Sequence, residues 1–255
     1  MIIGLRLVLV RDVRIFFSNF YGVGFRSLNI VLETVLFAYI LTRIVPISGT
    51  NGLTYLQYYA LGSIVISVFW ASYSIGRDVF WDKESGYMNY LMTLPISRTQ
   101  IILGRSLGGS LRGIFSVLPL YALASVLVPT TALNILESVG LLFIFSMGLC
   151  GLGITIALSV REETKVLLLN TLLSLTLIRA STAMYPATAM PVWLQVGTRL
   201  NPLTYTADSI RSVTTHAPGG SFPVDEISII VLFTVLASVL GSWIFSRMVE
   251  GGSSE

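Results

Sequence analysis

Long apolar stretches separated by short polar segments dominate the chain. A helix needs about 20 apolar residues to cross the hydrocarbon core of a bilayer. Residues 53–76 and 227–246 contain no charged residue over 24 and 20 positions, and four further stretches approach this length. The pattern predicts an all-α integral membrane protein with six transmembrane helices, at 27–45, 53–76, 109–128, 138–159, 166–184 and 227–246.

The polar segments complete a single transmembrane domain over residues 1–255. In residues 1–20, Arg6, Arg11 and Arg14 share one side of a helix and apolar residues share another, which predicts a helix lying in the membrane interface. Tyr87 and Leu91, with Tyr90 and Leu94, recur at helical spacing inside the charged loop. This loop predicts a short amphipathic helix that docks on a partner protein, although a helix resting on the membrane surface fits equally well.

Composition limits the remaining possibilities. Hydrophobic residues make up 54% of the chain and charged residues 11%, against about a quarter charged in soluble domains, so no sizeable soluble domain is expected. The single cysteine, Cys150, allows neither a disulfide framework nor a thiolate metal site. The net charge of +3 is explained by arginines near lipid headgroups, without a nucleic-acid partner.

The distribution of basic residues predicts the orientation. With the N-terminus inside, twelve of the sixteen Lys and Arg residues fall on the inner side and four on the outer side. Basic residues concentrate in cytoplasmic loops. The sequence therefore predicts a multi-pass protein of the cell membrane with both termini in the cytoplasm.

Two motifs resemble those of the type-2 permeases of ATP-binding-cassette (ABC) exporters. The first is an acidic-x-acidic-x-Gly run, then Leu, then Pro-apolar-Ser-Arg, and it comprises Asp82, Lys83, Glu84, Gly86, Leu91, Pro95 and Arg98. The second is an Asn-Pro-Leu-x-Tyr motif before the last span, formed by Asn201, Pro202, Leu203 and Tyr205. The family more often has Thr and Glu where Tyr87 and Asn89 stand.

The resemblance implies a function and an assembly. The first motif would make residues 82–98 the coupling helix that sits on a separate nucleotide-binding ATPase subunit. Residues 185–211 would form short re-entrant helices that close the path outward, where an ordinary external loop is the simpler alternative. The chain would be a permease subunit for an amphipathic or lipid-like substrate, a drug or a glycan, paired as a homodimer or heterodimer with a second permease.

ATP and Mg²⁺ would bind the partner subunit, and no cofactor is expected in this chain. A P-loop needs Gly-x4-Gly-Lys-Ser/Thr, and the only lysines, Lys83 and Lys165, lack the preceding glycines. The chain is therefore not expected to be an enzyme, and no catalytic or metal-binding residues are assigned.

Other classes remain open. A secondary transporter or a membrane scaffold would need no ATPase partner. An intramembrane metalloprotease is the weakest alternative, because Glu162 and Glu163 are predicted on the opposite side of the membrane from His216, the only histidine.

Two charges within the predicted spans suggest an ion pair. Glu33 and Arg112 enter the first and third spans at similar depth, and charges within a membrane usually pair or face water inside a bundle. We therefore hypothesise that they pair or line a common vestibule. The simpler alternative is a protonated Glu33 and an Arg112 that snorkels to the headgroups.

Overall fold

The computed structural model describes residues 2–18, 20–44, 49–50, 52–94, 96–160, 162–215 and 224–251. Within these residues the regular structure is entirely helical, which confirms the all-α prediction. The helices are, in order, α1 (Ile2–Ser18), α2 (Phe20–Ile44), α3 (Tyr55–Tyr73), α4 (Ile75–Glu84), α5 (Tyr87–Thr93), α6 (Arg98–Leu127), α7 (Ala132–Ser159), α8 (Glu163–Arg179), the 3-10 helix η1 (Ala187–Ala189), α9 (Val192–Arg199), α10 (Pro202–Thr215) and α11 (Val224–Gly251).

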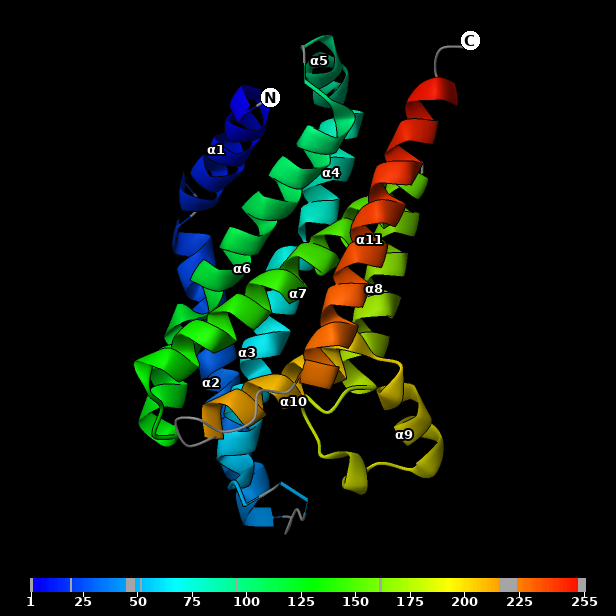
Figure 1. The fold of residues 1–255 in the computed structure, drawn as a ribbon. Helices are drawn as coiled ribbons and strands as arrows, with labels where there is room; N and C mark the ends of the chain where they lie inside the picture. Colours follow the sequence, from blue (N-terminus) through cyan, green and yellow to red (C-terminus); the bar gives the residue numbers. More distant parts are fainter. Residues whose placement is uncertain are drawn as a thin grey trace.

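The long helices form an elongated bundle with two different ends (Figure 1). Helix α5 lies at one end, together with the first turns of α1 and the last turns of α11. Helices α9 and α10 lie at the opposite end, beside the beginning of α3. We call these the α5 end and the α10 end of the bundle.

Four segments of the described chain are long and apolar enough to cross a membrane. They are Tyr55–Glu84, which covers α3 and α4, Thr99–Leu127 of α6, Ala132–Ser159 of α7, and Val224–Ile244 of α11. These segments contain the predicted spans 53–76, 109–128, 138–159 and 227–246 almost completely. The predicted spans 27–45 and 166–184 fall on α2 and on α8. Neither helix is among these four segments, and α8 has only 17 residues.

Local sequence signals explain where the long helices begin. Thr54 and Gln57 form a capping box at the start of α3, and Ser97 and Gln100 form another at the start of α6. In each box the hydroxyl accepts from a backbone N–H and the glutamine returns a bond to the cap, so two otherwise unpaired donors are satisfied. These boxes set the register of two central helices.

The core lies where α3, α6 and α7 pack together, with Phe69, Phe145 and Leu149 almost fully buried. Small residues allow the closest contact, because a Cβ on Gly153 of α7 would lie 2.8 Å from the Tyr73 carbonyl oxygen. Gly76 of α4 faces Gly153 in the same contact. Such small-residue contacts let helices pack closely in membranes.

The predicted coupling segment, residues 82–98, is not one helix. Helix α4 ends at Glu84, α5 runs from Tyr87 to Thr93, and α6 begins at Arg98. Glu84 therefore ends α4, and the short amphipathic helix predicted around Tyr87 and Leu91 is α5 alone. The physical reason is Gly86, whose φ of +75° breaks the helical path between them.

Candidate functional site

An ion-pair cluster joins three helices at the α5 end. Arg11 of α1 donates from Nη2 and Nη1 to the two carboxylate oxygens of Asp82 in α4, at 2.8 and 3.1 Å. Arg105 of α6 donates from Nη1 to Asp12 Oδ1 at 2.9 Å and also contacts Asp82 Oδ2. The cluster therefore holds α1 against both α4 and α6.

The members of this cluster are shielded from solvent to different degrees. The side chains of Asp12 and Arg105 are 1% and 2% exposed, and that of Arg11 is 27% exposed. Burial raises the pKa of the Asp12 carboxyl above its ordinary value, and Arg105 opposes that shift. When one partner of a buried ion pair is removed, the other is left as a costly unpaired charge. Substitution of a charged residue in this cluster should therefore destabilise the α5 end.

Arg11 also reaches α5 itself. Its guanidinium carbon lies 3.9 Å from the centroid of the Tyr87 ring, within the range of a cation–π contact. One side chain of α1 therefore contacts both the end of α4 and the first residue of α5.

Helix α5 is anchored on one side and exposed on the other. Met88 is 5% exposed and Leu91 is fully buried, whereas the Tyr90 ring is 57% exposed. Nearby, Trp81 of α4 is 52% exposed and Glu84 is exposed. These three exposed residues, Trp81, Glu84 and Tyr90, define a surface that we call the α5 face.

The first motif is thus divided between structural and exposed positions. Asp82 is held by arginines, Lys83 donates to the Val160 carbonyl at 3.1 Å, and Leu91 is core. Glu84 remains exposed, and Gly86 supplies the left-handed turn. Pro95 and the side chain of Arg98 lie outside the described residues.

Arg112 pairs with a different carboxylate from the predicted one. Its Nη1 lies 2.5 Å from Asp78 Oδ2 of α4, whereas the Glu33 side chain on α2 is exposed. The hypothesis of a Glu33–Arg112 ion pair is therefore corrected to an Asp78–Arg112 pair. Helix α4 continues straight on from α3 beside α6, so Asp78 is the carboxylate that α6 meets.

The second motif joins two helices at the α10 end. Asn201 Nδ2 donates to the carbonyls of Leu177 and Ala180 at the end of α8, at 2.7 and 2.8 Å. Its Oδ1 accepts from the Leu203 N–H at 3.0 Å. Asn201 thereby satisfies unpaired groups at the end of α8 and the beginning of α10 at once.

The other motif residues support the same junction. Pro202 is the first residue of α10, where its missing N–H costs nothing. Leu203 is 1% exposed and belongs to the core. Tyr205 donates its hydroxyl to the Arg199 carbonyl at 2.6 Å, which ties α10 to the end of α9.

After α8 the chain leaves helical geometry while still buried. Ser181, Thr182, Ala183 and Met184 are all at most 5% exposed. Their carbonyls find side-chain donors: Tyr58 bonds Thr182 O, Arg211 bonds Ala183 O and Tyr55 bonds Met184 O, each at 2.9 Å. Irregular backbone inside a membrane bundle must be satisfied in this way.

Arg211 is the central residue of this region, and it was not among the site residues predicted from the sequence. Its guanidinium stacks 3.5 Å from the Tyr58 ring centroid and donates to Asp208 Oδ1 at 2.9 Å. The available signal was the i, i+3 spacing of Asp208 and Arg211 in a segment whose buried side includes Leu203, Ala207 and Ile210.

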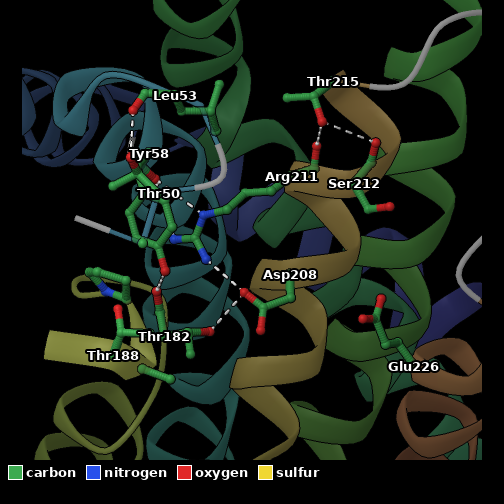
Figure 2. Close-up of a pocket in the computed structure, with 13 residues that line it drawn as sticks. Thr50, Leu53, Tyr58, Thr182, Thr188, Asp208, Arg211, Ser212, Thr215 and Glu226 are labelled. Carbon is green, nitrogen blue, oxygen red and sulfur yellow. Dashed lines mark hydrogen bonds and ion pairs between the residues drawn. The ribbon is translucent and has the colours of Figure 1, made fainter. Parts of the chain in front are cut away.

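These residues border a cavity at the α10 end (Figure 2). Its volume is about 410 Å³, and its lining includes Thr50, Tyr58, Thr182, Asp208, Arg211, Thr215 and Glu226. The lining comes from the approach to α3, the irregular segment after α8, α10 and the first turn of α11. The cavity is therefore built by the same segments that the Asn201 junction brings together.

A bundle of membrane-length helices with buried ion pairs and an irregular, fully bonded segment at one end defines an α-helical multi-pass membrane protein. Residues 4–214 match the family model for the ABC-2 type transporter. The chain belongs to this family of transport permeases, which confirms the resemblance found in the sequence.

Similar proteins carry the name transport permease ycf38. The chain is 29% identical to the one from Cyanophora paradoxa over 64% of its own length and 57% of the relative. It is 25% identical to the one from Porphyra purpurea, over 79% of its own length and 73% of that relative. The relative from Pyropia yezoensis is 27% identical over 64% of this chain, and that match spans 57% of the relative.

Proposed function

We propose that the chain is the permease subunit of an ABC exporter whose energy comes from ATP hydrolysis on a separate nucleotide-binding subunit. The observation that carries the proposal is the α5 face, whose exposed residues Trp81 and Glu84 lie at the end of α4 and Tyr90 on α5, beside the ion-pair cluster. Membership of the ABC-2 type transporter family supports this assignment. ATP and Mg²⁺ would be bound by the partner, and this chain would supply no catalytic group.

In the proposed mechanism the ATPase docks on Trp81, Glu84 and Tyr90. A displacement of α5 would be passed through Tyr87 to Arg11, and through Asp82 to Arg105. The displacement would therefore reach α1 and α6 together. Arg11 contacts Tyr87 and Asp82, and Asp82 in turn contacts Arg105. The α5 end would face the cytoplasm, with both chain termini on that side of the cell membrane.

At the opposite end, α9 and α10 with the segment after α8 would form the outer barrier of the path. The side-chain bonds to the carbonyls of residues 182–184 allow this segment to lie at membrane depth, as expected for a re-entrant element rather than an external loop. The proposed substrate is an amphipathic or lipid-like compound, a drug or a glycan.

We further propose that α2 and α8 complete six spans and that the permease works as a pair. Helix α8 presents exposed apolar side chains, with Leu168 56% and Leu172 61% exposed, and Leu36 on α2 is 60% exposed. Such surfaces suit lipid or a second permease, identical or related.

Co-purification and ATP hydrolysis test the proposal. The full chain should co-purify with an ABC ATPase from its native membrane, the complex should hydrolyse ATP, and the purified chain alone should not. A secondary transporter would move substrate without ATPase, a scaffold would move none, and a metalloprotease would cleave a peptide in a chelator-sensitive way. Full transport by the lone chain in liposomes would overturn the assignment.

A further inference from the structure

The cavity at the α10 end has a size suited to a small organic group. Ligand sites in proteins generally occupy about 300–1,000 Å³, and this cavity measures about 410 Å³. Its lining combines three charged side chains, Asp208, Arg211 and Glu226, with several hydroxyl groups. The ligand can therefore be inferred from which hydrogen-bonding groups remain open.

The positive group in the lining, the Arg211 guanidinium, makes most of its hydrogen bonds within the protein. Arg211 donates from Nη1 to Asp208, from Nη2 to the Ala183 and Tyr58 carbonyls, and from Nε to Tyr58 O. The face of its guanidinium is covered by the Tyr58 ring. Because most of its N–H groups are bonded and Asp208 already neutralises its charge, Arg211 is a poor receptor for an anionic ligand.

The hydroxyl protons nearest the cavity are also used. Thr50 donates to the Leu53 carbonyl at 2.6 Å, and Thr182 donates to Asp208 Oδ1 at 3.0 Å. Thr215 donates to the Arg211 carbonyl at 2.8 Å. A hydroxyl that has donated its proton can still accept, so these groups present oxygen lone pairs.

The carboxylates keep open acceptor capacity. The Asp208 side chain is 40% exposed, and its hydrogen bonds to Thr182 and Arg211 both involve Oδ1. Glu226 accepts from Ser209 through Oε2 at 3.1 Å. Among the described residues, no bond is made to Asp208 Oδ2 or to Glu226 Oε1. The lining contains two carboxylates and one guanidinium, and that guanidinium is already neutralised by Asp208.

We propose that this cavity binds the ammonium group of a small amine. An ammonium group carries three donors and one positive charge, which match the open acceptors and the surplus negative charge of Glu226. The amine is either a soluble alkylammonium compound or the headgroup of an amino lipid. The proposal concerns binding to the chain itself, so it stands or falls independently of an ATPase partner.

The test measures ethanolamine binding to the purified full chain in an uncharged detergent by calorimetry. Wild-type protein should bind ethanolamine saturably at pH 7, where the amine is charged, and should not bind the uncharged N-acetylethanolamine. Glu226→Gln should weaken ethanolamine binding by about tenfold or more, because a charged hydrogen-bond acceptor is lost while the shape is kept. Asp225→Asn is the matched control, since it makes the same charge change one residue away, outside the lining.

A second arm distinguishes the source of the amine. Phosphatidylethanolamine and phosphatidylglycerol are added in equal amounts, and the lipid retained by each variant is counted by native mass spectrometry. Selective retention of phosphatidylethanolamine by wild type and Asp225→Asn, but not by Glu226→Gln, supports the headgroup. Ethanolamine binding without that selectivity supports a soluble amine.

Several outcomes overturn the proposal. They are equal binding of ethanolamine and its acetylated form, equal effects of the two variants, or no saturable binding in either arm. Mg²⁺ binding that depends on Glu226, with no amine binding, would also overturn it. The comparison of the two ligands uses wild-type protein alone and remains decisive if a variant fails to fold.

Discussion

The guanidinium of Arg11 is bonded to both carboxylate oxygens of Asp82, a residue 71 positions further along the chain. This paired geometry fixes direction as well as distance, so α1 and the end of α4 are held in one orientation. Arg105 contacts the same carboxylate from α6. Asp82 is consequently the residue whose charge the α5 end depends on most.

Asp82→Asn should lower the stability of the protein by about 3–5 kcal/mol, because it leaves Arg105 buried with one carboxylate fewer. Thermal unfolding of the purified chain in detergent measures the change. Glu84→Gln is the control, since Glu84 is exposed two residues away and should leave the melting temperature almost unchanged. Similar shifts for both variants would contradict a structural role of the cluster.

Asn201→Ala should destabilise the α10 end, because two carbonyls of α8 and one N–H of α10 lose their partner together. Each buried group left unpaired costs about 1–3 kcal/mol. Asn29→Ala removes a similar side chain that bonds one carbonyl in an exposed setting and serves as the matched control. Proteolysis of residues 180–201, compared between the two variants, should show faster cleavage only for Asn201→Ala.

Gly153→Ala should destabilise the contact of α7 with the junction between α3 and α4, because the added methyl group would meet the carbonyl of Tyr73, the last residue of α3, at 2.8 Å. Overpacking of this kind typically costs about 1–3 kcal/mol. Gly140→Ala lies in the same helix with nothing within 4 Å of the new carbon and should stabilise by about 0.5–1 kcal/mol. Opposite shifts in melting temperature are expected, and shifts of the same sign would argue against the close approach.

Gly86→Ala should impair coupling through α5 by straining its entry. The left-handed backbone at Gly86 costs a residue with a side chain about 1–2 kcal/mol, and Gly86→Asn, which tolerates this conformation better, should recover part of the loss. The readout is substrate-stimulated ATPase activity in the complex. Gly52→Ala imposes a similar strain, at φ +84° with open space around it, far from α5, and should leave coupling intact; equal losses at both glycines would remove α5 from the mechanism.

Reporter fusions test the proposed orientation. Fusions after Glu84 and Arg247 should report the cytoplasm, and fusions after Thr50 and Pro129 should report the outside, because twelve of sixteen basic residues lie on the expected inner side. An external signal at either Glu84 or Arg247 would contradict the model in which the α5 face meets an ATPase.

Much of the fold follows from the length and polarity of the apolar stretches. The uncharged runs at 53–76 and 138–159 coincide with helices because, in lipid, a helix satisfies its own backbone groups. The amphipathic spacing around Leu91 likewise predicted a short helix, although Leu91 packs inside the chain and, of the residues with this spacing, only Tyr90 is left exposed for a partner. Local patterns were sufficient for both features.

Partners distant in sequence could not be predicted in the same way. Arg112 has several carboxylates within reach along the chain, and only the continuation of α3 into α4 places Asp78 beside it. The cavity was missed for a related reason, since Thr50, Asp208 and Glu226 come from three segments with no common motif. Asn201 was identified from its motif, but its two capping roles depend on the packing of α8 against α10.

The bonds from Tyr55, Tyr58 and Arg211 to consecutive carbonyls have a mechanical consequence. They fasten α3, residues 182–184 and α10 into one rigid body, while the Asp82 cluster fastens α4 to α1 and α6 in another. The two bodies also pack against each other where α3 meets α6, and along the α3–α4 span they join at Ser74, which both ends α3 and begins α4. We expect any tilt of one end relative to the other to pivot at Ser74, so that this span acts as a jointed lever rather than a stiff rod.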